Sequence, residues 1–423
     1  MSAHRPSVTF LLGTADGRNG VAKSVFTTAG HLASEWDVQI VGLFQRRSAP
    51  VHRIPPGVTL TFLQDLRPGR VKPGPGQRLL LKAPSRLLHW PGSPPVKGSS
   101  LLTDVLLSQW LQALRSDILI TTRSELHVAA ARFMPSEVRL VAQEHVHYFQ
   151  RSEPVRRRVE ACIDRIDALV VLTERDRHDY IEESPWPPGK ISVIANAVQC
   201  PLRSPVVERR KVVVAAGRLT PQKGFDRLID AFVPVARTHP DWQLHIFGKG
   251  PDRGSLKKQI KRREMSSHVR LMGWEDHLDQ VFSEASILAL SSRFEGLPLV
   301  VIEAMNQGLP TVAFDCPTGP RELVTHGETG LLVPNGDVVA FSRALTRLIT
   351  NSPLREIMGQ AALIDASRYQ LSAVGPQWEG LFKAVLSVVR TDPANAPRRR
   401  GPRGRASRIG RPALRTRAGG VKV

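Results

Sequence analysis

The sequence predicts an α/β fold made of two Rossmann-like domains, each with a doubly wound parallel sheet, that face a central cleft. A length of 423 residues is too great for one compact core and suits two domains. Short runs rich in Val, Ile and Leu recur along the chain, as expected for strands that are buried on both faces. Amphipathic stretches separate these runs, and such alternation indicates parallel sheets covered by helices.

The first domain is expected to span residues 1–198 and to contain seven strands. These are predicted at Val8–Gly13, Val38–Leu43, Val58–Leu63, Asp117–Thr122, Leu140–Gln143, Ala168–Thr173 and Ile191–Ala195. A polar segment with two prolines, residues 199–210, is the expected linker because a new buried strand follows it.

The second domain, residues 211–370, is expected to contain six strands. These are predicted at Lys211–Gly217, Gln243–Gly248, Val269–Gly273, Ile287–Ser291, Pro310–Phe314 and Gly330–Val333. Helical patterns lie between them, for example at Phe225–Arg237 and Val338–Asn351. In this architecture ligands bind at the carboxyl ends of the strands.

Two segments follow the second domain. Residues 371–390 carry an apolar face at helical spacing, with Trp378, Phe382 and Val385, and are predicted to form a terminal helix. Residues 391–423 contain ten Lys or Arg and one Asp, without an apolar period, so we predict a disordered basic tail. The tail is either a contact for an anionic surface or a solvated extension.

Composition and charge narrow the class of protein. The chain is 41% hydrophobic and 23% charged, which excludes wholesale disorder, and its net charge is +21. No apolar run approaches the roughly 20 residues that a membrane helix needs, and the first residues lack a signal-peptide pattern. Cys162, Cys200 and Cys316 are widely spaced, so they form neither a disulfide framework nor a metal motif and favour a reducing cytoplasm.

An irregular basic stretch interrupts the first domain at Leu66–Gly98. It has seven Lys or Arg, seven prolines and no acidic residue. An apolar cluster accompanies these residues: Leu79, Leu80, Leu81, Leu87, Leu88 and Trp90. Basic residues interleaved with Leu and Trp are typical of segments that bind a membrane surface. The alternative is a long surface loop folded onto its own domain.

The strongest chemical motif holds two acids, Glu295 and Glu303, in the segment RFEGLPLVVIEAM. A buried strand ends before the motif, a turn is expected at Glu295 and Gly296, and the proline that follows suits the start of a helix. The first amides of this helix, those of Leu299 and Val300, would be free to bind an anion. Glu303 lies among apolar neighbours, so its carboxylate requires a polar partner.

A second motif, VVAAGRLTPQKGF, places Arg218 and Lys223 five residues apart in the loop after the first strand of the second domain. Both cations would lie at the carboxyl edge of the sheet. A guanidinium and an ammonium that converge at one place suit a diphosphate.

Two weaker signals lie in the first domain. The glycine-rich loop GTADGRNGVAKS follows the first strand and opens a helix, and its Gly20 would allow a ligand to approach the backbone. The triplet QEH at the end of the fifth strand places His145 at the carboxyl edge. His127, His147 and His178 are interpreted as packed or surface histidines.

With these motifs the second domain resembles the retaining glycosyltransferases of the GT-B fold, family 4. The matching segments are GRLTPQKGFDRLIDAF, LHIFGKGPDR, VRLMGW, ILALSSRFEGLPLVVIEAMNQGLPTVAFDCPTGPRELV and HGETGLLVPNGD. The first domain matches more loosely, through its glycine-rich loop, QEH and VIANAV, and Asn19-Gly20 stands where the family commonly has Gly-Gly. FDCPTGPR looks most like the subgroup that builds exopolysaccharides, capsules and teichoic-type polymers.

The resemblance implies that four residues take part in catalysis. Arg218 and Lys223 would hold the diphosphate of a nucleotide sugar, most readily a UDP-sugar, and stabilise its charge as it leaves. Glu295 would face the hydroxyls of the donor hexose, and His145 would lie near the transferred sugar.

The substrate-binding set that the resemblance implies is larger, since Glu303 would accept hydrogen bonds from the ribose and the first helix amides would add to the diphosphate site. The set is Gly20, Arg218, Lys223, Gly273, Glu295, Gly296, Leu299, Val300 and Glu303. No cofactor or metal is expected, because the sequence has no Asp-x-Asp pair.

The implied reaction moves a hexose or N-acetylhexosamine, with retention, to a glycan, lipid-linked or cell-envelope polymer acceptor. The terminal helix would cross back onto the first domain. We expect a cytoplasmic enzyme with peripheral contact to the anionic inner face of the membrane. A nucleotide-sugar epimerase of the same fold is an alternative. A non-catalytic polyanion-binding protein is a second, although the sequence lacks the motifs of specific nucleic-acid binding.

Overall fold

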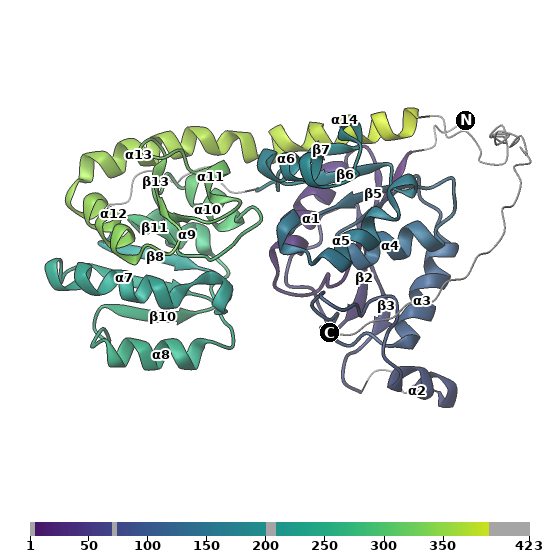
Figure 1. Ribbon diagram of the computed structural model, residues 1–423, viewed down its shortest axis with the longest axis horizontal. Helices are drawn as coiled ribbons and strands as arrows, with labels where there is room; N and C mark the ends of the chain where they lie inside the picture. Colours follow the sequence, from purple (N-terminus) through teal and green to yellow (C-terminus); the bar gives the residue numbers. More distant parts are fainter. Residues whose placement is uncertain (1–4, 70–73, 200–208, 389–423) are drawn as a thin grey trace, which may run out of the picture. The chain divides into compact units, whose positions relative to one another are not determined.

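The computed structural model describes residues 5–69, 74–199 and 209–388, which form two parallel β-sheets packed against helices (Figure 1). The strand orders are β3-β2-β1-β4-β5-β6-β7 and β10-β9-β8-β11-β12-β13. Both orders reverse beside the first strand of the sheet, which is the doubly wound arrangement with ligand sites at the carboxyl ends. The predicted fold class, two Rossmann-like parallel sheets, is therefore confirmed.

The first sheet is built from strands whose central members are completely buried. They are β1 (Ser7–Leu12), β2 (Asp37–Gln45), β3 (Val58–Asp65), β4 (Ile118–Thr121), β5 (Arg139–Gln143), β6 (Ala168–Val171) and β7 (Ile191–Val193). The helices that accompany them are α1 (Gly20–Leu32), α2 (Pro75–Lys82), α3 (Leu101–Gln112), α4 (Ser124–Phe133), α5 (Glu153–Glu160) and α6 (Glu174–Glu183). Helix α1 begins where the Asn19 side chain accepts a hydrogen bond from Ala22 N at 2.7 Å.

The second sheet has the same plan with shorter connections. Its strands are β8 (Val212–Ala216), β9 (Gln243–Phe247), β10 (Val269–Gly273), β11 (Ile287–Leu290), β12 (Thr311–Asp315) and β13 (Gly330–Pro334). The helices are α7 (Phe225–Thr238), α8 (Arg253–Arg262), α9 (Leu278–Glu284), α10 (Leu299–Met305), α11 (Pro320–Leu323), α12 (Val338–Thr350) and α13 (Ser352–Asp365). Every strand expected from the sequence coincides with one of the observed strands to within two residues at each end.

The last described helix, α14 (Leu371–Ser387), follows the second domain in sequence but packs against the first. Its Trp378 and Phe382 are buried in one apolar cluster with Phe10 of β1 and Val38 of β2. The Trp36 ring meets Phe382 edge-on, with 4.9 Å between the ring centroids. Helix α14 thus contributes apolar side chains to a cluster of the first domain.

The described residues up to Leu386 form one compact unit that contains both sheets. Most of the linker expected at residues 199–210, and the whole basic tail expected at 391–423, lie outside the described residues. Among the described residues, no helix combines the length and the apolar composition needed to cross a bilayer.

The stretch Leu66–Gly98 divides into two parts, and the sequence interpretation is wrong for one of them. Leu88 and Trp90 are 0% and 6% exposed within the first-domain core, so they cannot serve as membrane anchors. The cause is Asp104 of α3, which accepts hydrogen bonds from Ser85 Oγ at 2.5 Å and Arg86 N at 2.6 Å. This buried carboxylate fastens the second part of the stretch onto its own domain.

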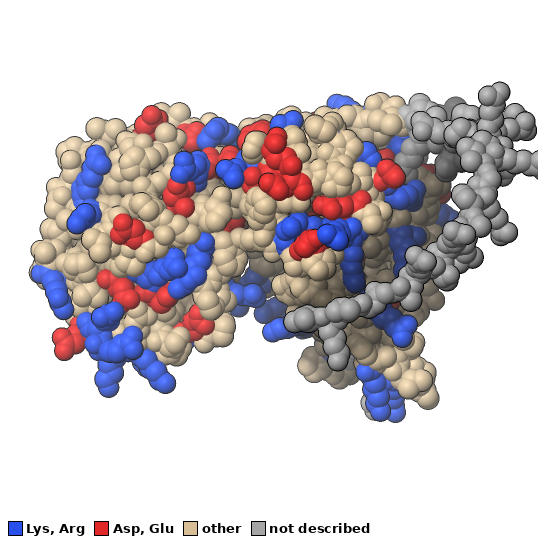
Figure 2. Space-filling view, in the orientation of Figure 1, with Lys and Arg blue, Asp and Glu red and all other residues tan. Residues whose placement is uncertain are grey.

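The first part of the stretch behaves differently. Helix α2 has Leu79 72% exposed, and Arg78 and Lys82 are exposed on the same short helix. Figure 2 shows basic side chains over α2 and again over α8, with acidic side chains between the basic ones elsewhere on this face. The amphipathic surface predicted from the sequence is thereby confined to α2.

Candidate active site

The central feature of the site is an ion pair at the carboxyl edge of the second sheet. Lys223 Nζ lies 2.6 Å from Glu295 Oε1, and the Ser292 hydroxyl donates to the same oxygen at 2.5 Å. The Glu295 side chain is 6% exposed and that of Lys223 18%. Two motifs that the sequence presents separately, after β8 and after β11, are thus joined by one contact.

The chain around this pair is held by close backbone packing. Gly224 has φ +61°, in the left-handed region, and a Cβ there would overlap the carbonyl of Ser291. The Thr318 hydroxyl donates to the carbonyl of Glu295 at 2.5 Å. Glu295 is therefore fixed through both its side chain and its main chain. Arg218 is exposed beside this structure, and no hydrogen bond among the described residues joins it to the pair.

Glu303 lies in α10 and is 6% exposed, and its required polar partner comes from the first domain. Lys23 Nζ, in the first turns of α1, lies 2.5 Å from Glu303 Oε1. A Cβ on Gly20 would stand 3.4 Å from Leu299 Cδ1, so the starts of α1 and α10 lie against each other. Sequence reasoning missed Lys23, although it belongs to the glycine-rich loop segment that was already singled out.

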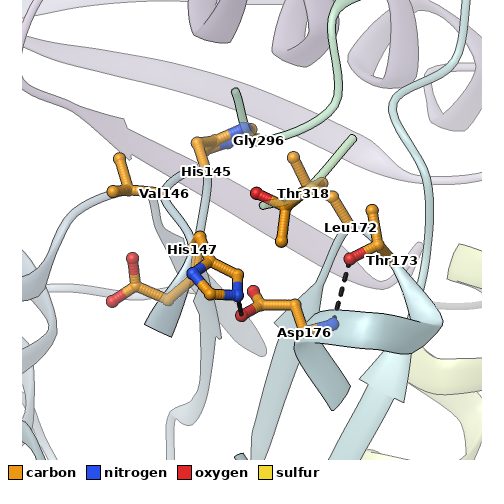
Figure 3. A pocket seen from close by; sticks show the side chains of 9 residues that line it. His145, Val146, His147, Leu172, Thr173, Asp176, Gly296 and Thr318 are labelled. Atoms are coloured by element: carbon orange, nitrogen blue, oxygen red, sulfur yellow. Dashed lines mark hydrogen bonds and ion pairs between the residues drawn. The ribbon is translucent and has the colours of Figure 1, made fainter. Parts of the chain in front are cut away.

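His145 follows β5 and lies against the turn that carries Glu295 (Figure 3). A Cβ on Gly296 would stand 2.7 Å from the carbonyl oxygen of His145, so only glycine fits without a shift. Burial, opposed by Glu144, lowers the pKa of His145 to about 4, and the ring is neutral at pH 7. Its Nε2 atom is buried and has no hydrogen-bond partner among the described residues.

A small pocket opens beside His145, and groups from both domains line it (Figure 3). Its walls include Thr318 of the second domain and His147, Thr173 and Asp176 of the first. His147 Nε2 lies 2.8 Å from Asp179 Oδ2 and 3.8 Å from Asp176 Oδ1. The interpretation of His147 as a packed or surface histidine is therefore incomplete, because it is buried and also lines the pocket.

Among the titratable groups that line this pocket, Asp176 has a strongly raised pKa. Burial raises the pKa of Asp176 to about 7, a hydrogen bond from Tyr148 N opposes the shift, and the charges of Glu144 and Asp179 add to it. The Asp176 carboxyl is thus partly protonated near neutral pH, unlike an exposed aspartate.

A buried network lies behind His145. Glu144, which also lines the pocket, lies 2.5 Å from Arg151, 3.1 Å from the Ser124 hydroxyl and 3.3 Å from His127 Nε2. Burial would raise the pKa of Glu144, but Arg151 and His127 bring it down to about 2. His127 is fully buried, as the sequence interpretation has it. The network fixes the chain that presents His145.

The remaining candidate residues lie near the same edge. Gly273 ends β10 with φ +87° and accepts a hydrogen bond from Gly248 N at 2.5 Å. The next residue, Trp274, lies with its ring under the Arg18 guanidinium, 4.8 Å from ring centroid to Cζ. Leu299 and Val300 are half-buried at the start of α10. No group of His, Cys, Asp and Glu in the described ranges could hold a metal ion.

Comparison with known sequences covers both halves of the chain. Residues 203–364 match the family described as glycosyl transferases group 1, and residues 18–200 match the family described as glycosyltransferase family 4. An exopolysaccharide phosphotransferase of Streptomyces coelicolor is 34% identical over 98% of this chain, which spans 43% of that protein's length. The amylovoran biosynthesis glycosyltransferase AmsD of Erwinia amylovora is 29% identical over 63% of this chain and 77% of its own.

Among solved structures, one of TarM from S. aureus in complex with fondaparinux, alpha-GlcNAc-glycerol and UDP has a similar fold. The TM-score is 0.73 at 16% sequence identity, and the alignment covers 89% of this chain and 99% of that one. This likeness concerns the fold.

Proposed function

Because the chain belongs to the GT-B-fold glycosyltransferases of group 1, we propose that it transfers a hexose or N-acetylhexosamine from a UDP-sugar to a cell-envelope polysaccharide, glycan or lipid-linked acceptor. The relatives named for exopolysaccharide and amylovoran synthesis support this acceptor class. The UDP complex of TarM supports the choice of nucleotide. The shared region is less than half of the Streptomyces protein, so its phosphotransferase activity is not part of the proposal.

The observation that carries the proposal is the Lys223–Glu295 pair, 2.6 Å long, beside the close approach of Gly296 to His145. A cation for a leaving diphosphate and an acid for sugar hydroxyls are thereby held together at one sheet edge. Neutral His145 faces them from the other domain. Such a preorganised arrangement lowers the barrier by stabilising charge as it develops on the leaving group.

In this reaction Lys223 and Arg218 bind the diphosphate. Arg218 is exposed, so it is free to turn toward the ligand. When the ammonium of Lys223 binds a phosphate oxygen, the Glu295 carboxylate can accept hydrogen bonds from the hydroxyls of the hexose. Glu303 accepts hydrogen bonds from the ribose, and the α10 start, Gly20 and Gly273 line the rest of the donor site.

We further propose that transfer proceeds with retention and without a metal ion, because side chains meet the leaving charge and no Asp-x-Asp pair occurs in the sequence. The diphosphate oxygen that leaves would assist deprotonation of the acceptor hydroxyl. The enzyme would act at the inner membrane face, where α2 offers exposed Leu79 beside Arg78 and Lys82 to anionic lipid.

The first experiment is a donor screen by thermal unfolding of the full chain. A nucleotide sugar at 100 times its Kd adds about 2.7 kcal/mol to the free energy of unfolding, which is readily measured. Hydrolysis and transfer of that donor are then followed with and without glycan acceptors. If no nucleotide sugar stabilises the chain and none is turned over, the proposed activity is refuted.

The roles of the two acids are separated by calorimetry with UDP. Glu303→Ala should weaken UDP binding, because its partner is the ribose. Glu295→Ala should leave UDP affinity nearly intact and lower sugar transfer. Glu356→Ala, at an exposed site on α13, is the matched control that should change neither. Equal losses of UDP affinity in the two site variants would contradict the assignment.

A further inference from the structure

One short segment of the first domain reaches two groups of the second. This Arg18–Lys23 segment runs from the glycine-rich loop into the first turn of α1. Lys23 Nζ lies 2.5 Å from Glu303 Oε1, and the Arg18 guanidinium lies over the Trp274 ring at 4.8 Å. Glu303 and Trp274 belong to α10 and to the chain that follows β10, which are separate parts of the second sheet's carboxyl edge.

The exposure of the Lys23–Glu303 pair shows on which side ligand can reach it. The side chain of Glu303 is 8% exposed and that of Lys23 is 48% exposed. The ammonium therefore stands at the outer side of a buried carboxylate. A ligand that binds Glu303 therefore finds a solvent-accessible lysine side chain whose Nζ is 2.5 Å from that carboxylate.

A lysine ammonium can contact two anionic partners at once. It carries three N–H donors that point in different directions, so a carboxylate and a phosphate can share one ammonium. In a nucleoside diphosphate the first phosphate is attached directly to the ribose, so a ribose at Glu303 brings that phosphate near Lys23. An anionic phosphate oxygen is the acceptor that such a donor binds most strongly.

We propose that Lys23 is a donor-binding residue supplied by the first domain, whose ammonium binds the ribose-proximal phosphate while it stays in contact with Glu303. This inference rests on the proposed assignment of Glu303 to the ribose. It gives the diphosphate a third cation, which approaches from the side of the first domain, opposite Arg218 and Lys223. The nucleotide is then held by both domains, and its binding is coupled to the approach of His145.

Two local features place the ammonium before any ligand arrives. The Asn19 side chain caps α1, and Gly20 brings the start of the helix against Leu299. The Arg18–Trp274 stack fastens the other end of the segment to the second domain without the help of Glu303. Lys23 is thus presented by a segment with contacts at both ends.

The test compares ligands with and without phosphate. Binding of UDP and of uridine is measured by calorimetry on the full chain for wild type, Lys23→Ala and Lys23→Arg. We expect Lys23→Ala to bind UDP about 10-fold more weakly, as loss of a charge-assisted hydrogen bond implies. Its affinity for uridine should not fall, and Lys23→Arg should keep UDP affinity within a few-fold. Lys257→Ala, an exposed lysine of α8, is the matched control.

Three results would count against the inference. Unchanged UDP affinity in Lys23→Ala refutes it, and so does an equal loss of UDP and uridine affinity, which would mean that Lys23 acts only by holding Glu303. If the wild-type chain does not bind UDP at any concentration tested, the proposed UDP-sugar donor is refuted. The inference about Lys23 is then refuted as well. Thermal unfolding of each variant checks that the fold is retained.

Discussion

Replacing Gly296 with alanine would test the close approach of the Glu295 turn to the chain that follows β5. The added Cβ would lie 2.7 Å from the carbonyl oxygen of His145 and 3.9 Å from Leu172 Cδ1. Ordinary van der Waals contact begins at 3.4 Å, so the Gly296–His145 gap must widen by about 0.7 Å. The obstructing atom is a backbone oxygen just after β5, so it cannot rotate away as a side chain would.

The expected loss of transfer rate follows from the position of this displacement in the site. It separates Glu295, on one side of the gap, from His145 on the other, and a misplacement of 1 Å can cost about 10²-fold in rate. We expect Gly296→Ala to lower kcat for sugar transfer by about 10- to 100-fold. UDP affinity should stay within a few-fold, since Lys223 and Glu303 do not touch the new methyl group.

The assay is the initial rate of transfer with the donor found by thermal unfolding, together with calorimetry for UDP. Gly254→Ala is the control, because a Cβ at that position would meet no atom within 4 Å apart from its chain neighbours and the backbone of α8 itself. That substitution, at the second residue of α8, should leave activity intact. Full transfer activity in a folded Gly296→Ala variant would refute the idea that this contact sets the site geometry.

Four further expectations follow from the described contacts and the sequence. Lys223→Ala should lower kcat by on the order of 10²-fold, and normal turnover would remove its assignment to the diphosphate. Transfer should survive excess EDTA, and a loss that added divalent metal restores would contradict the metal-free proposal. Because the pKa of Asp176 is raised to about 7, the native state holds a proton that the unfolded chain releases near pH 4, so stability falls as pH rises between these values. The stability gained by Asp176→Asn should therefore be larger at pH 8 than at pH 4, and an equal gain at both would contradict the shift. Changing Arg78 and Lys82 to Glu should reduce sedimentation with anionic vesicles more than removal of residues 391–423 does, and the reverse ranking would make the tail the anchor.

Most strands were predictable because they are buried on both faces, which leaves an apolar run in the sequence. The edge strands β3 and β10 are more exposed and carry polar residues between their apolar ones. Lys223 and Glu295 were predictable as site residues. Each lies in a short motif that also shows where a strand ends, so its position at the carboxyl edge of the sheet could be inferred. Their direct contact was not predictable, since it depends on two loops that leave neighbouring strands. The partner of Glu303 was not predictable from the sequence either, because Lys23 is 280 residues away and belongs to the other domain.

Two other misses have a different cause. Composition alone cannot show that Leu88 and Trp90 are buried, because the deciding group, Asp104, lies on the next helix and anchors the segment through backbone amides. The place of His147 in the pocket could not be predicted, because this residue follows the strand β5. The apolar pattern identifies the strand but does not predict the path of the chain after it. That path is set by Asp176 and Asp179 of α6, which hold Tyr148 N and the His147 ring.

The position of α14 has a consequence for biosynthesis. Trp378, Phe382 and Val385 complete an apolar cluster whose other members, such as Phe10 and Trp36, are translated at the very start of the chain. During synthesis part of the core of the first domain stays open to solvent after residue 198 has been made, until α14, which begins at Leu371, has left the ribosome. A nascent chain that is halted before α14 would expose this surface to chaperones and to other chains. The packing of α14 is therefore the step that removes this exposed apolar surface of the first domain.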